Sequence, residues 1–203
     1  MTNQRTIDAV REVTAEPQRI VVLFPAVGRA VGRAPIDPSG DPLGVRRGTV
    51  DDGARAQLVG ALVTAMPPAE SAAQLGDLYR HGDDAERRGV LCGLNAAPGA
   101  PAAVVAVGLE LVSDALRTND PRLVAAALGS FAAEHLDQHA VPPGVLKALF
   151  MGIPLDVVAG LERRADDELA RMAVGLIDER RAAGRTVSDD MLRLATITTT
   201  PGG

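Results

Sequence analysis

Aromatic side chains are almost absent from this chain of 203 residues. It has no tryptophan, and its only aromatic residues are Phe24, Tyr79, Phe131 and Phe150. Because apolar residues still make up 46% of the sequence, the core has to be built mainly from alanine, valine and leucine. Cysteine is equally scarce. Cys92 stands alone, which excludes a disulfide within the chain and a zinc site built on several cysteines.

Basic residues are fewer than acidic ones. The chain carries 26 acidic and 21 basic residues, a net charge of −5, and Lys147 is its one lysine. Without a positive field, nucleic acid is not expected as a partner. The best candidate for a membrane span, residues 89–109, is interrupted by proline and glycine at 98–101, which predicts a turn and no transmembrane segment. The first residues lack the apolar region of a secretory signal, so we expect a protein of the reducing cytoplasm.

Helical spacing of apolar residues recurs along the chain, and the alternation typical of strands does not. The length indicates one helical domain over residues 1–195, followed by a flexible tail at 196–203. Residues 33–48 are rich in proline, glycine and aspartate and predict one long loop, of a length that is often functional. Prolines 142 and 143 are expected to interrupt a helix. Helices are predicted over 5–15, from 17, over 49–67, 68–82, from 83, over 104–116, from 121 through 131, over 144–151, from 154, over 166–183 and from 188.

One local pattern occurs three times. In each copy an arginine precedes an aspartate by three residues at a turn between helices, and apolar residues follow in a similar register. The aspartates are 37 and then 46 residues apart, which brackets the spacing of HEAT and armadillo repeats. We therefore predict an all-α fold of stacked antiparallel helix pairs, a HEAT/armadillo-like right-handed solenoid, although helix caps attract aspartate in any protein. The pairs are Arg80 with Asp83, Arg117 with Asp120, and Arg163 with Asp166.

Several blocks of the sequence resemble a known family. The two most specific blocks are KALFM at residues 147–151 and LERRADDELARM at residues 161–172. They are similar to the EboA family of metabolite-traffic proteins, and the resemblance extends over most of the chain. Shorter similar blocks lie at residues 24–32, 49–52, 78–87, 117–119, 154–155 and 179–185. The sequence departs from the family at residues 141–144 and at Arg181, where members carry aromatic side chains.

The resemblance implies a helical protein from a bacterial gene cluster that moves or matures a secondary-metabolite precursor. Its neighbours in such clusters include a membrane prenyltransferase of the UbiA type and barrel proteins that resemble hydrolases or isomerases. The implied partners are a small-molecule metabolite precursor and proteins of the same cluster, including the prenyltransferase. The implied location is the cytoplasm, either free or peripheral to the inner face of the membrane.

Lys147 is the first candidate site residue, because it lies in an apolar helix within a family-like block. A desolvated lysine can act as a Schiff-base nucleophile or bind an anion, but it can equally pair with an acid such as Glu162 or extend its ammonium group to water. Arg117 and Asn119 can bind an anionic or carbonyl group at a helix N-terminus. As a part of the repeat, Arg117 would instead bond an acid of a neighbouring repeat, and Arg163 recurs in the same register.

His135 and His139 are four residues apart, so a single helix would place both imidazoles at the spacing of metal ligands. The local sequence supplies no third ligand, and Pro142 suggests that the helix frays near His139, which favours a capping or exposed role. Cys92 lies in an apolar stretch and is predicted to belong to the core rather than to act as a nucleophile. We therefore expect no metal, no cofactor and no catalytic residue.

Two hypotheses for the function remain. The leading one is a non-catalytic helical scaffold that binds or traffics a metabolite precursor or docks the enzymes of its cluster. The alternative is an enzyme that acts on a metabolite intermediate, with its site around Lys147, His139 and Arg117. A convergent polar pocket with perturbed ionisable groups would favour the enzyme, and an apolar groove would favour binding. The predicted ligand-binding residues are Arg117, Asn119, His139, Lys147, Glu162 and Arg163.

Overall fold

The chain folds into helices joined by turns and one long loop. The computed structural model describes residues 3–196, so the tail expected at 196–203 lies outside the described residues except for Thr196. Residues 3–196 contain no strand, so the all-α prediction is confirmed, and no helix in this range is long and apolar enough to cross a membrane. The α-helices are α1 (Gln4–Ala15), α2 (Ile20–Val31), α3 (Val50–Ala65), α4 (Pro68–His81), α5 (Asp84–Asn95), α6 (Ala102–Arg117), α7 (Pro121–Ala127), α8 (Ser130–His135), α9 (Val141–Phe150), α10 (Leu161–Arg164), α11 (Asp167–Ala182) and α12 (Asp189–Ala195).

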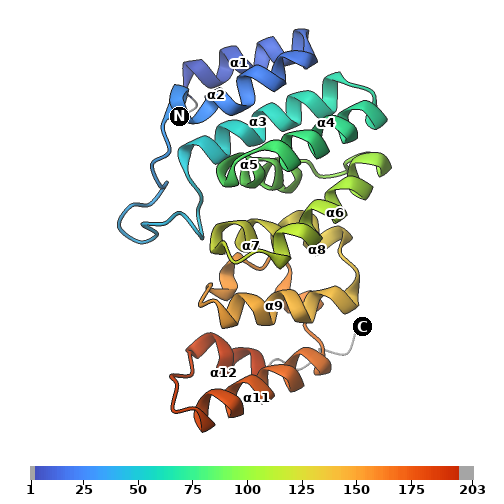
Figure 1. The fold of residues 1–203 in the computed structure, drawn as a ribbon. Helices are drawn as coiled ribbons and strands as arrows, with labels where there is room; N and C mark the ends of the chain where they lie inside the picture. Colours follow the sequence, from blue (N-terminus) through green and yellow to red (C-terminus); the bar gives the residue numbers. More distant parts are fainter. Residues whose placement is uncertain (1–2, 197–203) are drawn as a thin grey trace.

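The helices follow one another along a single axis (Figure 1). α1 and α2 lie at one end of the stack, α11 and α12 lie at the other, and the remaining helices come between them in chain order. Contacts join helices that are two apart in the chain: α1 packs on α3, α3 on α5 and α5 on α7, while α4 packs on α6 and α6 on α8. The core divides into one cluster between α1 and α8 and a second between α7 and α12.

Small residues let the central helices approach closely. Gly89 and Gly93 lie one turn apart on α5, on the side that faces α3. A Cβ atom at Gly93 would lie 2.3 Å from Cβ of Val59, and a Cβ atom at Gly89 would lie 2.3 Å from Cδ of Arg55. Such short separations leave no room for any side chain, so glycine sets the spacing between α3 and α5. The near absence of aromatic bulk is consistent with this close packing.

Capping side chains lie at the starts of several predicted helices. Thr49 caps α3, and its N–H donates to Oδ2 of Asp52 at 2.7 Å. Asp83 caps α5 in a capping box, because its Oδ1 accepts the N–H of Glu86 at 2.9 Å. The capping side chains of three later helices, α7, α11 and α12, are those of Asp120, Asp166 and Ser188.

The prediction of one helix from residue 121 through 131 is wrong. The structure has two helices, α7 and α8, separated at Leu128 and Gly129. Asn95 at the end of α5 holds this break: its Oδ1 accepts the N–H of Phe131 at 3.0 Å, and its Nδ2 donates to the carbonyl of Ala126 at 2.8 Å. The contact joins residues more than 30 positions apart, so the local sequence carried no sign of it.

Prolines 142 and 143 begin a helix instead of interrupting one, which corrects a second prediction. α9 starts at Val141, and both prolines lie in its first turn, where a missing N–H costs no intrahelical hydrogen bond. The helix expected from residue 154 is a 3₁₀ turn, η3 (Leu155–Val157), which is followed by the short α10.

The histidine pair does not share a helix. α8 ends at His135, and the backbone is extended at Leu136. His139 lies in a separate 3₁₀ turn, η2 (Gln138–Ala140). The two imidazoles are therefore not aligned at positions i and i+4, and His139 lies beyond the end of the helix and is exposed, as Pro142 suggested.

Candidate functional site

The 33–48 loop is folded, and Asp41 organises it. The buried carboxylate of Asp41 accepts the backbone N–H groups of Val45, Arg46 and Arg47 at 2.8 to 2.9 Å. Burial alone would raise the pKa of Asp41, but these three donors outweigh burial and hold the pKa below its ordinary value. The negative charge of one side chain therefore fixes the bend at residues 41–47.

Two arginines tie the loop to the helical stack. Arg46 donates from Nε to Oδ2 of Asp156 in η3 at 2.8 Å, which joins segments 110 residues apart. Arg88 on α5 donates from Nη2 to the carbonyl oxygen of Gly44. The loop consequently lies along one side of the stack, in contact with its N-terminal and C-terminal halves (Figure 1).

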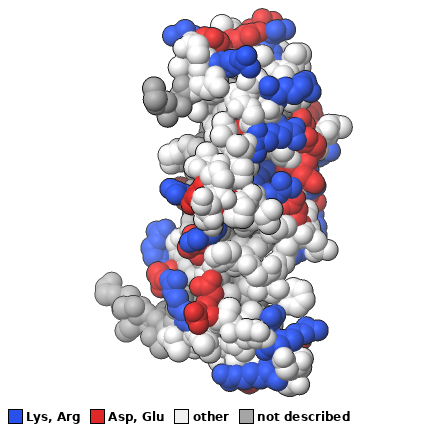
Figure 2. Space-filling view, turned by 90° about the vertical axis from the view of Figure 1, so that its left-hand side faces the viewer, with Lys and Arg blue, Asp and Glu red and all other residues white. Residues whose placement is uncertain are grey.

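A cavity of about 370 Å³ lies between the loop and the helices, and we call it the loop cavity. Its walls come from the loop, α3, α5, α7 and η3, and they combine small apolar residues with several charged ones. Acidic and basic side chains lie close together on the face of the molecule that carries the loop (Figure 2). The lining residues are Ile36, Val45, Arg46, Arg47, Gly48, Thr49, Asp52, Gly53, Ala56, Arg88, Cys92, Asn95, Ala125, Ala126, Gly129, Asp156 and Val157.

Two buried ion pairs lie at the start of α3, beside the cavity. Arg55 pairs with Asp51 at 2.5 Å, and Nε of Arg88 lies 3.2 Å from Oδ2 of Asp52. Taking these charges out of water is costly, and the cost is recovered only when every polar atom finds a partner. Among the side-chain atoms of these two ion pairs, three buried ones have no hydrogen-bond partner within residues 3–196: Oδ1 of Asp52, Nη2 of Arg55 and Nε of Arg88. Buried polar atoms of this kind are rare in a packed core, so the start of α3 departs from ordinary packing.

Cys92 lines the same cavity but is not suited to nucleophilic chemistry. Burial raises the pKa of its thiol to about 12, and the nearby charge of Asp52 adds to that rise. The thiol therefore stays protonated at neutral pH, and the thiolate is the form that attacks electrophiles. Cys92 is partly buried and lines the cavity, so the expectation that it belongs to the core is met only in part.

The geometry of the loop and cavity can be compared with known proteins. Residues 46–196 match the family model described as metabolite traffic protein EboA. The chain belongs to the EboA family. No curated protein and no solved structure gives a significant match to it. The region that matches EboA includes all of the lining of the loop cavity except Ile36 and Val45.

Two of the ligand-binding residues predicted from the sequence lie at the turn between α6 and α7, outside the EboA loop cavity. Arg117 is exposed and donates to Oγ of Ser113 and Oδ1 of Asp114, in its own helix, at 3.0 and 3.1 Å. Arg117 was expected to bond an acid of a neighbouring repeat. The bond between neighbouring helices is instead made by Arg87 of α5, which donates to Asp114 of α6 at 2.5 Å. Asn119 is exposed beside a shallow hollow.

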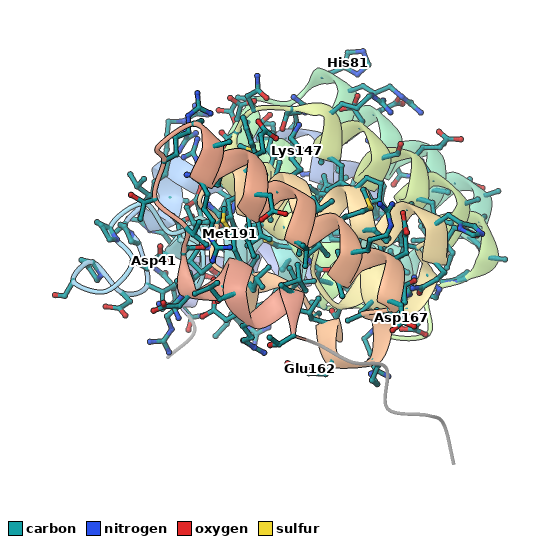
Figure 3. The ribbon with its side chains drawn as sticks, turned by 90° about the horizontal axis from the view of Figure 1, so that it is seen from below. Asp41, His81, Lys147, Glu162, Asp167 and Met191 are labelled. Carbon is teal, nitrogen blue, oxygen red and sulfur yellow. The ribbon has the colours of Figure 1, made fainter. Side chains whose placement is uncertain are left out.

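The other four predicted residues lie in the C-terminal half. Lys147 is partly buried on α9, and it does not pair with Glu162, whose partner is Arg193 of α12. Figure 3 shows Lys147 and Glu162 on opposite sides of the stack. Arg163 is exposed on α10, and His139 is exposed in η2. None of the six predicted residues lines the loop cavity.

A second cavity, an apolar groove of about 260 Å³, lies between α1, α2 and α3. Two of its charged side chains are already engaged: Arg5 donates to the carbonyl of Ala30 at 2.7 Å, and Glu12 accepts from Arg19 at 2.5 Å. The groove therefore offers a ligand mainly apolar contact. It is lined by Arg5, Thr6, Asp8, Ala9, Glu12, Leu23, Ala26, Val27, Ala30, Val31, Ala54 and Leu58.

Sequence reasoning missed the residues that build the loop cavity. It marked the length of the 33–48 loop and the block at 49–52, which form the rim and one wall. It did not find Arg46, Arg88 or Asp156, because their partners are distant in the sequence. The available signal was the long loop itself, since such loops often carry function in a compact domain.

Proposed function

We propose that this member of the EboA family is a non-catalytic helical scaffold that holds a small-molecule metabolite precursor in the loop cavity. The family description, metabolite traffic, supports a small molecule as the partner. The observation that carries the proposal is the cavity itself. Its volume of about 370 Å³ lies in the range of roughly 300–1,000 Å³ that is typical of small-molecule sites, and its walls combine apolar residues with five charged ones.

We further propose that the stack is a right-handed solenoid of the HEAT/armadillo type. The packing of helices two apart in the chain supports this arrangement. A second support is that Arg80 pairs with Asp77 and Arg117 pairs with Asp114, in the same register 37 residues apart. A solenoid offers an extended surface to other proteins. We therefore propose that the scaffold passes its ligand to enzymes of its gene cluster, including a membrane prenyltransferase, in the cytoplasm or at the inner face of the membrane.

The enzyme hypothesis has weaker support. Its residues Lys147, His139 and Arg117 do not line the loop cavity, and the contacts of Arg117 lie within its own helix. The one thiol in the cavity is held in its protonated form by burial. We therefore propose binding and transfer of a metabolite, without chemistry, as the role of the site.

Filling the cavity tests this function. Ala56 is partly buried on α3 and lines the cavity, so Ala56→Phe places a ring in the ligand's space. In cells that carry the gene, we expect this variant to reproduce the effect of deletion, with the metabolite made but wrongly distributed between cells and medium. The matched control is Ala182→Phe at an exposed position on α11, outside the cavity lining, which should behave as wild type.

Profiling of metabolites in cells and medium gives the readout. Accumulation of one unconverted precursor in the Ala56→Phe strain would contradict a non-catalytic role, because it would place a chemical step at the cavity. A wild-type distribution in that strain would remove the cavity from the function.

A further inference from the structure

The apolar groove between α1, α2 and α3 is a cavity of its own, apart from the loop cavity. It lies at the end of the stack that α1 and α2 form (Figure 1). Both of these helices precede residues 46–196, so the match to the EboA family model does not include them. α3 contributes to both cavities with different residues: Ala54 and Leu58 line the groove, and Ala56 lines the loop cavity. The role proposed for the loop cavity therefore leaves the groove without an assignment.

Two polar contacts join α1 to α2 at opposite ends of the groove. Arg5 in the first turn of α1 donates to the carbonyl oxygen of Ala30 in the last turn of α2, at 2.7 Å. Glu12 in the last turn of α1 accepts from Nε of Arg19, directly before α2, at 2.5 Å. The two helices are therefore held together at both ends, and the groove lies between these contacts.

Alanine side chains leave the space between these contacts unfilled. Ala9 of α1 and Ala26 of α2 line the groove, and neither reaches beyond its Cβ atom. Three further lining residues, Val27, Ala54 and Leu58, belong to the core and are at most 5% exposed. Helices in a packed core interdigitate with few voids, so this unfilled space lacks the contacts that close packing supplies. An apolar molecule of matching shape would supply those contacts.

The rim of the groove favours a neutral ligand. Its charged side chains, Arg5, Asp8 and Glu12, all belong to α1 and include both signs. Each already has a polar partner in the protein, and for Asp8 this partner is Gln4, which donates to it at 2.9 Å. An anion would meet Asp8 and Glu12, and a cation would meet Arg5, so neither charge is favoured. α2 and α3 contribute only apolar residues to the lining.

The size of the groove sets the length of that ligand. The groove has a volume of about 260 Å³. An apolar cavity of roughly 150 Å³ holds a benzene ring, so the groove has room for roughly ten carbon atoms. We propose that it is a second binding site, which takes a neutral aliphatic molecule with a chain of roughly eight to ten carbon atoms. This inference goes beyond the function proposed for the loop cavity and does not depend on it.

Straight-chain alcohols test the chain length: 1-butanol, 1-hexanol, 1-octanol and 1-decanol, with octanoate as the charged counterpart of 1-octanol. Binding is followed by NMR of the methyl groups of Val27, Val31 and Leu58, which line the groove. We expect the affinity to rise roughly two- to fourfold for each added CH₂ group and to level off at roughly eight to ten carbons, once the groove is filled. Octanoate should bind more weakly than 1-octanol.

Ala26→Leu is the informative variant, because Ala26 is partly buried in the lining and a larger side chain there occupies the ligand's space. We expect it to weaken binding of 1-octanol at least roughly tenfold. Ala30→Leu fills the same groove and takes its place if Ala26→Leu does not fold, as judged by circular dichroism. The matched control is Ala182→Leu at an exposed position on α11, which should bind 1-octanol like the wild type.

Four outcomes would overturn the inference. The affinity could be independent of chain length, octanoate could bind more tightly than 1-octanol, or a folded filling variant could bind 1-octanol as tightly as the wild type. In the fourth, ultracentrifugation would find a dimer that 1-octanol dissociates, which would make a second copy of the chain the occupant of the groove. The two proposals fail separately, because Ala56→Phe should bind 1-octanol like the wild type whatever its effect on the metabolite.

Discussion

At the scale of single residues, one carboxylate determines the form of the loop. Asp41 holds three successive backbone N–H groups, whereas Asp37 holds one such group, that of Gly40, at 2.9 Å. A hydrogen bond to a charged group contributes about 1.5–3 kcal/mol, and an amide side chain cannot accept from three donors with the same strength. The order of the loop, and with it the shape of the cavity, therefore depends on the charge of Asp41.

Replacing or protonating Asp41 should open the loop. Because the folded pKa lies below the ordinary value of 3.8, the stabilisation is fully present at neutral pH and is lost as the pH falls through the folded pKa. We expect the amide NMR signals of residues 45–47 to move only below about pH 3.8 in the wild type. In Asp41→Asn they should already lie at the open positions at pH 7, while amides of α3 stay unchanged.

Asp37→Asn is the control for this prediction, because Asp37 accepts a single backbone N–H in the same loop and the amide oxygen of asparagine can still accept it. It should shift the signals of residues 45–47 far less than Asp41→Asn does. Equal shifts in the two variants, or a wild-type transition well above pH 4, would contradict the role given to Asp41.

At the scale of elements, α3 and α5 approach each other closely at Gly89 and Gly93, where an added Cβ atom would meet the shortest separations of any glycine in residues 3–196. Gly93→Ala would place a methyl group 2.3 Å from Cβ of Val59, so one helix has to move. Overpacking of this kind costs about 1–3 kcal/mol of the free energy of unfolding. Urea denaturation followed by circular dichroism measures the loss.

The matched control is Gly175→Ala on α11, where a Cβ atom meets nothing within 4 Å. There alanine should stabilise the protein by roughly 0.5–1 kcal/mol, because it has the higher helix propensity. If both variants gain stability, the close approach of α3 and α5 is not a constraint on the fold.

The elements also show where prediction from the sequence succeeds and where it fails. The starts of α3 and α5 were predicted within one residue, at 49 and 83, because a helix start depends on residues within one turn of each other. The break between α7 and α8 was missed because Asn95, on another helix, holds it. The prolines at 142 and 143 were misread because the same residue begins a helix in its first turn and ends one in its interior.

The candidate site also contains features that depend on local sequence and features that depend on distant contacts. The loop and the acids at the start of α3 are visible in the sequence as a long segment and a cap. The arginines that complete the cavity are not, because Arg46 and Arg88 acquire their roles from partners 110 and 44 residues away. The residues chosen from the sequence lay at helix ends and turns, where exposed polar side chains are expected without any ligand.

At the scale of the whole molecule, the loop joins the two halves of the stack. It leaves α2, crosses α5 at Arg88 and reaches η3 at Asp156, so it spans both core clusters. The loop cavity lies where these contacts meet. Under the proposed function, a ligand held there would touch the loop and both halves.

Native mass spectrometry of the protein taken from cells that make the metabolite tests this account most directly. The wild type and Ala182→Phe should each carry one small molecule that is released on denaturation, and Ala56→Phe should carry none. A wild-type protein free of any small molecule, or an equal load on Ala56→Phe, would contradict the claim that the loop cavity holds a metabolite.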